Sequence, residues 1–236
     1  MPACLADVRI INGLFCVMRA GCPWRLPPSD FPPWETIYRC FATFRDEARF
    51  EKINHALVMM DRERAGREAS PSGAILDSQS VKTTEAAHLR GCETVKKING
   101  RKRHALVDTD GCGLLLEPHP ASIQDRDGGP PLLYASRGSI HFIEKVFTDS
   151  GCAGRKVAEA TVIAVEIVHK NLDQVGFAVQ PRHWVVERFF AWINRDRRLA
   201  KDFEATIDSA RAFLYAASVM LLVRRLPPIM TFETDS

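Results

Sequence analysis

The spacing of apolar residues changes near residue 70, and this change constrains the fold more than any other feature of the sequence. Before it, apolar residues recur every three to four positions, as they do in amphipathic helices. After it, short apolar runs of strand length are separated by turn residues and then alternate with further helical segments. The sequence therefore predicts a small all-helical N-terminal region followed by a mixed α/β domain in which helices flank a sheet.

Changes in local composition give the boundaries of the predicted helical region, linker, α/β domain and tail. The helical region covers 1–63, and two Pro-Pro pairs divide it because proline stops a helix. Residues 64–73 are polar and rich in Gly, Ser and Pro, which indicates a linker. The α/β domain is expected at 74–226, and 227–236 form a tail. Strand-like runs are expected within 73–83, 101–111, 113–122 and 141–151 and around 162–168, with late helices at 184–198 and 209–225.

Composition excludes several classes of protein. The seven cysteines are odd in number and form no Cys-x-x-Cys pair, which argues against a disulfide framework or a zinc ribbon. The first residues lack the layout of a signal peptide. The longest strongly apolar stretch, 212–223, is too short to span a bilayer. We therefore expect a cytoplasmic protein with no membrane partner.

Positive charge is concentrated in two places, although the whole chain has a net charge of only +3. Residues 96–103 hold five basic residues and no acid, and 182–201 hold six basic residues against two acidic ones. Such clusters fit a polyanionic partner. The alternative for either cluster alone is a solvated helix face or turn.

Two aspartates, Asp77 and Asp149, each follow a strand-like run and precede small or polar residues. Open α/β sheets build their sites where strands end, because side chains leaving neighbouring strands converge there. Taken singly, an aspartate in such a place is more often a turn former.

Glu187 is the one carboxylate in the apolar segment "WVVERFFAWI". At 3.6 residues per turn, it shares a helix face with His183, Asn194 and Arg198. The other aromatic and aliphatic residues of the segment are expected in the core: Trp184, Val186, Phe189, Phe190, Trp192 and Ile193. A helix packed on the sheet would present Glu187 to the strand ends, whereas the alternative is a surface glutamate paired with Arg188 or another base.

Three carboxylates that converge repel one another unless cations lie between them. Oxygen ligands suit Mg²⁺, and two such ions about 4 Å apart can bind the attacking and leaving oxygens of a phosphoryl transfer. Basic patches nearby would hold a DNA backbone against the metals.

Four segments resemble one family in the right order: "ILDSQSVKTTE", "GRKRHALVDTDG", "FTDSGCAG" and "WVVERFFAWINRDRRLAKDFE". They closely resemble the DDE transposases of bacterial insertion sequences, in the IS-five group, and the likeness covers about residues 10–226. It implies an RNase H-like catalytic domain whose metal-binding triad is Asp77, Asp149 and Glu187. It also implies Mg²⁺, with Mn²⁺ as a substitute, and hydrolysis at transposon ends followed by attack of the 3′-hydroxyls on target DNA. A homodimer on DNA, associated with the nucleoid, follows from the need to pair two ends.

Twelve residues are candidates for contact with terminal inverted repeats or target DNA. They are Lys82, Lys96, Lys97, Arg101, Lys102, Arg103, Arg182, His183, Arg188, Arg195, Arg198 and Lys201.

The chain departs from the family pattern at three positions and at its start. His183 stands where arginine is usual, and Cys92 and Cys152 stand where tyrosine is usual. The chain also begins later than the family pattern, so a shortened, degenerate copy that only binds DNA is the alternative function. A repair nuclease with an RNase H-like fold is a third reading, disfavoured by the helical region before Asp77.

Overall fold

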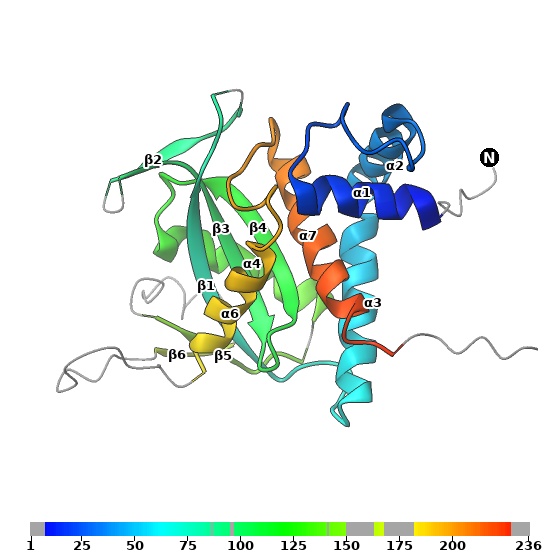
Figure 1. Ribbon diagram of the computed structural model, residues 1–236. Helices are drawn as coiled ribbons and strands as arrows, with labels where there is room; N and C mark the ends of the chain where they lie inside the picture. The colour runs from blue at the N-terminus through cyan, green and yellow to red at the C-terminus, as the bar shows by residue number, and fades with distance from the viewer. Residues whose placement is uncertain are drawn as a thin grey trace, which may run out of the picture.

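Six helices and one six-stranded sheet make up the part of the chain that the structure describes (Figure 1). The structure, a computed structural model, describes residues 8–85, 87–94, 97–140, 142–149, 163–167 and 182–227. The helices are α1 (Val8–Ala20), α2 (Trp34–Asp46), α3 (Arg49–Arg64), α4 (Asp125–Ser139), α6 (Trp184–Ile193) and α7 (Ile207–Val223). The strands are β1 (Gly73–Lys82), β2 (Gly91–Glu93), β3 (Ile98–Asp108), β4 (Gly113–Pro120), β5 (Lys145–Thr148) and β6 (Ala164–Ile167).

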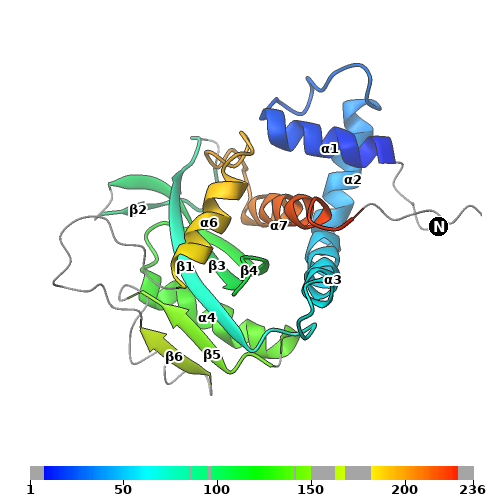
Figure 2. The same cartoon turned by 60° about the horizontal axis from the view of Figure 1, so that its bottom comes forward.

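The sheet is mixed and curled, as Figure 2 shows, and its strand order is β2-β3-β1-β5-β6 with β4 beside β3. β3 runs antiparallel to β1, β2 and β4, whereas β5 pairs in parallel with β1 and β6 in parallel with β5. The predicted mixed α/β sheet is thus confirmed. The short strand β2 was not predicted, because three residues are too few to show alternation.

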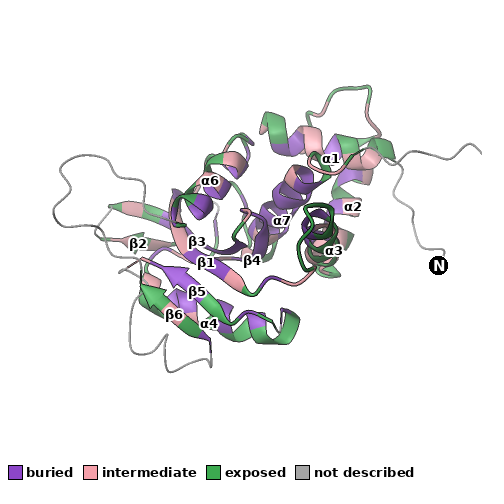
Figure 3. Ribbon diagram, turned by 90° about the horizontal axis from the view of Figure 1, so that it is seen from below, coloured by how far each residue is buried: buried purple, intermediate pink, exposed green. Residues whose placement is uncertain are grey.

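Helices cover both faces of the sheet (Figure 3). Successive side chains of a strand point to opposite faces, and β1 shows this directly. Ile75 packs in one core with residues of α6 and α7, whereas Ala74 and Leu76 pack in a second core with residues of α4. The same alternation directs Asp77 toward α6 and Ser78 toward α4.

The sequence did not predict α4, because it contains Gly128, Gly129, Pro130 and Pro131. Close packing on the sheet explains one of the glycines. A Cβ atom at Gly128 would lie 2.5 Å from Cε1 of His104, so only glycine lets the helix approach β3 this closely.

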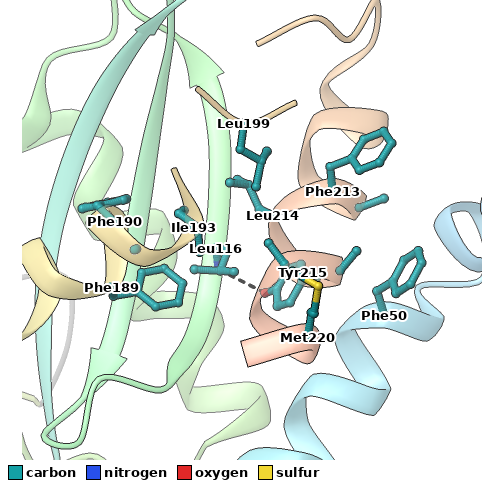
Figure 4. Close-up of a cluster of buried hydrophobic side chains, with 14 of the residues drawn as sticks. Phe50, Leu116, Phe189, Phe190, Ile193, Leu199, Phe213, Leu214, Tyr215 and Met220 are labelled. Atoms are coloured by element: carbon teal, nitrogen blue, oxygen red, sulfur yellow. Dashed lines mark hydrogen bonds between the residues drawn. The ribbon is translucent and has the colours of Figure 1, made fainter. Parts of the chain in front are cut away.

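The N-terminal helices share a core with α6 and α7 rather than standing apart (Figure 4). Phe41 of α2 stacks on Phe213 of α7, with ring centroids 4.5 Å apart. Tyr215 of α7 reaches the sheet, where its hydroxyl accepts a hydrogen bond of 3.1 Å from the backbone N–H of Leu116. α3 ends at Arg64 and β1 begins at Gly73, so the connection between them falls within the predicted linker segment.

Some predictions fall outside the described residues: Lys96, Cys152 and the tail beyond Pro227. Among the helices that are described, none is both long enough and apolar enough to cross a membrane.

Candidate active site

Asp77 and Asp149 occupy neighbouring strand positions. Leu76 of β1 pairs with Thr148 of β5 in parallel register, so each aspartate is the next residue along its strand direction. β5 ends there, whereas β1 continues to Lys82. Ile75 and Phe147, two residues before the aspartates, belong to the core beneath α6. The backbone therefore brings both aspartates to one strand end, on the face that α6 covers.

Asp77 is largely buried and held by two groups. Its Oδ1 accepts a hydrogen bond of 2.7 Å from the backbone N–H of Ser78, and its Oδ2 lies 3.6 Å from Nε2 of His183. Burial raises the pKa of Asp77 to about 6. The charge of His183 and the Ser78 hydrogen bond oppose that rise, whereas the charge of Asp149 adds to it. Asp77 thus carries a negative charge that its surroundings compensate poorly.

Glu187 lies in the first turn of α6, and its side chain is 61% exposed. Its Oε1 is 4.0 Å from Nε2 of His183, one helical turn earlier. His183 is therefore interposed between Asp77 and Glu187. The imidazole is buried, and its Nδ1 has no hydrogen-bond partner within the described ranges.

The donor set is chemically suited to a divalent cation, although the carboxylates are not gathered tightly. Among the described residues, no three His, Cys, Asp or Glu side chains lie close enough together to hold a metal ion. Carboxylate oxygens are nevertheless the ligands that Mg²⁺ prefers. The raised pKa of Asp77 indicates that a cation beside Asp77 and Asp149 would relieve uncompensated charge.

A polar cluster supports Asp77 from the opposite face of the sheet. The hydroxyl of Ser78 donates a hydrogen bond of 2.6 Å to Asp125, which also lies 2.8 Å from the ammonium group of Lys102. Burial alone would raise the pKa of Asp125, but the hydrogen bonds from Lys102 and Ser78 outweigh it and lower that pKa. Asp125 was not predicted as a site residue because α4, which begins at this residue, was not predicted.

His104 and His119 lie behind this cluster and form a pair. Nδ1 of His104 is 2.6 Å from Nε2 of His119, and the two rings stack. Burial lowers the pKa of His104 to about 3, so the imidazole is neutral at physiological pH.

The burial of three predicted DNA contacts contradicts the idea of a basic surface at 101–103. Arg101, Lys102 and Arg103 are at most 2% exposed. Arg101 forms an ion pair of 3.1 Å with Asp202, and Arg103 donates a hydrogen bond of 2.7 Å to the carbonyl of Leu199. β3 is an inner strand that is covered on both faces. These basic side chains therefore contact other parts of the protein and are not exposed to solvent.

Arg198 is also turned inward, contrary to its predicted place on the face of Glu187. α6 ends at Ile193, so the helical periodicity does not reach this residue. The guanidinium of Arg198 forms a buried ion pair of 2.8 Å with Glu204 and lies over the ring of Trp24.

Arg188 is half-buried and engaged with neighbouring groups. It donates a hydrogen bond of 3.0 Å to the carbonyl of Asp110 and lies over the rings of Trp184 and Trp192. Trp184, predicted to be core, is 41% exposed, whereas Phe189 and Phe190 are buried as expected.

Four of the predicted DNA contacts are exposed: Lys82, Lys97, Arg182 and Arg195. Lys201, like Arg188, is half-buried. Arg182 precedes the buried His183 and lies over the ring of Phe147 at the end of β5, 4.4 Å from its centroid. Its φ of 70° is in the left-handed region, which is uncommon for a residue with a side chain.

Comparison with known proteins agrees with this geometry. A family model for the DDE domain of transposases matches residues 68–223, which include Asp77, Asp149 and Glu187. The chain belongs to the DDE transposase family. A second family model, for transposases of the IS4/5 family, matches residues 2–54.

The relatives of this DDE transposase include a protein of Brucella ovis that is named for the transposase of insertion sequence element IS6501. The two are 27% identical over 127 residues, which is 52% of this chain and 98% of the Brucella protein. No solved structure matches the chain. The resemblance to insertion-sequence transposases inferred from the sequence is thereby confirmed.

Proposed function

We propose that this DDE transposase cleaves DNA at the ends of an insertion sequence and joins the exposed 3′-hydroxyls to target DNA. The parallel pairing of β1 with β5 carries the proposal, because it puts Asp77 and Asp149 side by side beneath the helix that bears Glu187. We also propose that the α/β part is RNase H-like. An antiparallel group of β1, β3 and β4, extended by the parallel strands β5 and β6, supports that assignment.

The proposed roles follow from the contacts of each side chain. Asp77, Asp149 and Glu187 would hold two Mg²⁺ or Mn²⁺ ions, with the amide of Ser78 fixing the orientation of Asp77. When bound, the ions supply Lewis-acid activation of the attacking oxygen and stabilise the leaving oxygen. His183, between two of the carboxylates, would keep them oriented toward one another. No serine or tyrosine nucleophile is required, because the attacking group is water or a 3′-hydroxyl.

The proposed substrate determines the assembly and the location of the protein. Two transposon ends must be held together for joining, so we propose a homodimer on DNA, in the bacterial cytoplasm and at the nucleoid. We propose that Arg182, which is exposed beside the strand ends, contacts a phosphate near the carboxylates.

The second candidate function is DNA binding without cleavage. It is favoured by the position of His183, whose Nε2 lies 3.6 Å from Asp77 and 4.0 Å from Glu187 and so occupies the space between the carboxylates. An arginine there, usual in the family, would be a permanent cation with a longer reach.

Plasmid nicking tests the proposed chemistry. Purified wild-type protein is incubated with supercoiled plasmid in Mg²⁺ or Mn²⁺, beside Asp149→Asn and a control, Asp46→Asn. Asp46 is exposed on α2 and pairs with Arg45. We expect wild type and the control to nick, and Asp149→Asn to be slower by at least about 100-fold, the scale of losing a charge-stabilising group. Normal DNA binding with no nicking by any of the proteins would favour the second candidate.

A further inference from the structure

A basic pocket of about 520 Å³ lies at the end of β1 beyond Asp77. Four cations line it: Lys82, Arg90, Lys97 and Lys201. Glu85 is the one acidic residue in the lining, so the side chains around the pocket have a net charge of +3. Thr83 and Asn99 add neutral hydrogen-bonding groups. This composition suits an anion with several oxygens.

Three segments that are distant in sequence form the walls. Lys82 ends β1, Lys97 lies in the connection between β2 and β3, and Lys201 belongs to the segment between α6 and α7. Backbone hydrogen bonds join two of these walls. The N–H of Asp202 donates to the carbonyl of Lys82 at 2.9 Å, and the N–H of Thr84 donates to the carbonyl of Asp202 at 3.3 Å.

The buried side chain of Arg101 connects the walls of the pocket through its hydrogen bonds and an ion pair. Its guanidinium pairs with the carboxylate of Asp202 and donates to the carbonyls of His88, Glu204 and Ala205 at 2.6, 2.9 and 3.0 Å. One side chain therefore links β3 to the segment after β1 and to the segment before α7. The pocket is built by the fold and does not depend on a ligand to assemble it.

The lysines of the pocket lack a directly paired carboxylate among the residues that the structure describes. Across the described ranges, no carboxylate forms an ion pair with Lys82, Lys97 or Lys201. Some buried or half-buried cations elsewhere in the fold do have acidic partners: Arg101, Arg198 and Arg211 form close ion pairs with acidic side chains. Clustered cations without counter-charges repel one another, so the arrangement becomes favourable when an anion enters.

Backbone strain is found at the same place. Leu89, next to Arg90, has a φ of 50°, and Lys97 has a φ of 52°. Left-handed conformations at residues other than glycine are strained and persist where the surroundings impose them, often at binding sites.

We infer that this pocket binds phosphodiester groups of the DNA backbone at a fixed distance from the catalytic carboxylates, an assignment that rests on the proposed function. Lys82 follows Asp77 by five residues in one strand, a span of about 17 Å at roughly 3.4 Å per residue. That span is longer than the roughly 3.4 Å by which neighbouring phosphates of one strand are separated along the duplex axis. The pocket therefore engages a part of the backbone other than the phosphate at Asp77. It sets the register of the DNA and takes no part in the chemistry.

Salt-dependent DNA binding tests the inference without any cleavage. A fluorescently labelled duplex is titrated in EDTA, by anisotropy, with wild type and with Lys82→Gln/Lys97→Gln. The control, Lys52→Gln/Arg137→Gln, removes the same charge from exposed cations of α3 and α4 that have no ion pair among the described residues. Circular dichroism and thermal melting establish that all the variants are folded.

Losing two phosphate contacts is expected to weaken binding roughly 60-fold at about 0.1 M salt and to reduce the slope of log K against log salt by about 1.8. The control should change binding by less than about threefold, since charges beyond a Debye length are screened. Equal losses in both double variants, no loss in the pocket variant, or no DNA binding by wild type would overturn the inference.

A second arm separates the DNA backbone from a free phosphate as the ligand. Millimolar inorganic phosphate is added to the wild-type complex at constant ionic strength. The duplex should remain bound, and its displacement would assign the pocket to a free anion instead. The binding assay contains EDTA, so its result does not depend on metal-dependent cleavage. A protein that binds DNA as expected in this assay but does not nick plasmid in Mg²⁺ or Mn²⁺ refutes the proposed chemistry and leaves the assignment of the pocket unchanged.

Discussion

Replacing Asp77 by asparagine is expected to make the folded protein more stable at neutral pH, although the residue is a proposed metal ligand. The substitution keeps the side-chain volume and the oxygen that accepts the hydrogen bond from Ser78. It removes a charge that is largely buried beside Asp149 and is only partly offset by His183. Proteins often carry such destabilising groups at sites of chemistry.

The size of the effect follows from the pKa of Asp77. A value of about 6 in the folded protein, against an ordinary value of about 3.9, corresponds to about 3 kcal/mol. This figure is a ceiling, because the side chain is 18% exposed and solvent screens part of the charge. Between the two pKa values the folded protein holds a proton that the unfolded chain has released, so the stability of the wild type falls as pH rises from about 4 to about 6.

Urea unfolding in EDTA measures the effect at several pH values. Near pH 4 the free energies of unfolding of wild type and Asp77→Asn should agree. Above pH 6 the variant should be more stable, by up to about 3 kcal/mol. Asp46→Asn, at an exposed carboxyl whose pKa its hydrogen bond to Arg45 lowers, should show no such gain. A variant less stable than wild type at pH 7 would refute the idea that the charge of Asp77 is poorly compensated.

Two further substitutions, one of them with a control, test which interactions stabilise the fold. Asp202→Asn should lower the free energy of unfolding by about 3–5 kcal/mol, because it leaves the buried charge of Arg101 uncompensated. Asp208→Asn, at the exposed end of α7, should cost less than about 1 kcal/mol, and similar melting temperatures for the two variants would contradict this reasoning. Tyr215→Phe should cost about 1–3 kcal/mol in urea unfolding, because the buried N–H of Leu116 loses its acceptor. An unchanged midpoint would mean that water or another group replaces the hydroxyl.

Local patterns in the sequence predicted most of the sheet and the place of its aspartates. The apolar runs before Asp77 and Asp149 correspond to β1 and β5, and the Asp-Gly signal at Asp110 lies between β3 and β4. The alternation of apolar and polar residues identifies a strand regardless of which strands pair with it. The position of both aspartates at strand ends and the family resemblance indicated that they converge. The parallel register that sets them side by side depends on distant contacts, and neither argument predicted it.

The misassigned residues are those whose environment comes from far along the chain. The basic run at 101–103 looked like a surface, but Arg101 meets Asp202, about a hundred positions later. Arg198 was placed by helical periodicity, which stops at Ile193. α4 was hidden by Pro130 and its neighbours, since residues that weaken a helix are tolerated where tertiary packing stabilises it. Composition and periodicity are local, whereas these features are tertiary.

The core that the N-terminal helices share with α7 has a consequence for how copies of such an insertion sequence lose their function. Twelve residues of α7 are buried, and several of them are covered by the N-terminal helices. Loss of the codons for those helices would therefore not leave a nuclease domain that folds by itself. It would expose an aromatic surface that includes Phe213, and such surfaces promote aggregation. Cellular proteases would be expected to remove the truncated product. Loss of the amino-terminal codons should therefore silence the element by eliminating the protein, and a catalytically active fragment should not persist.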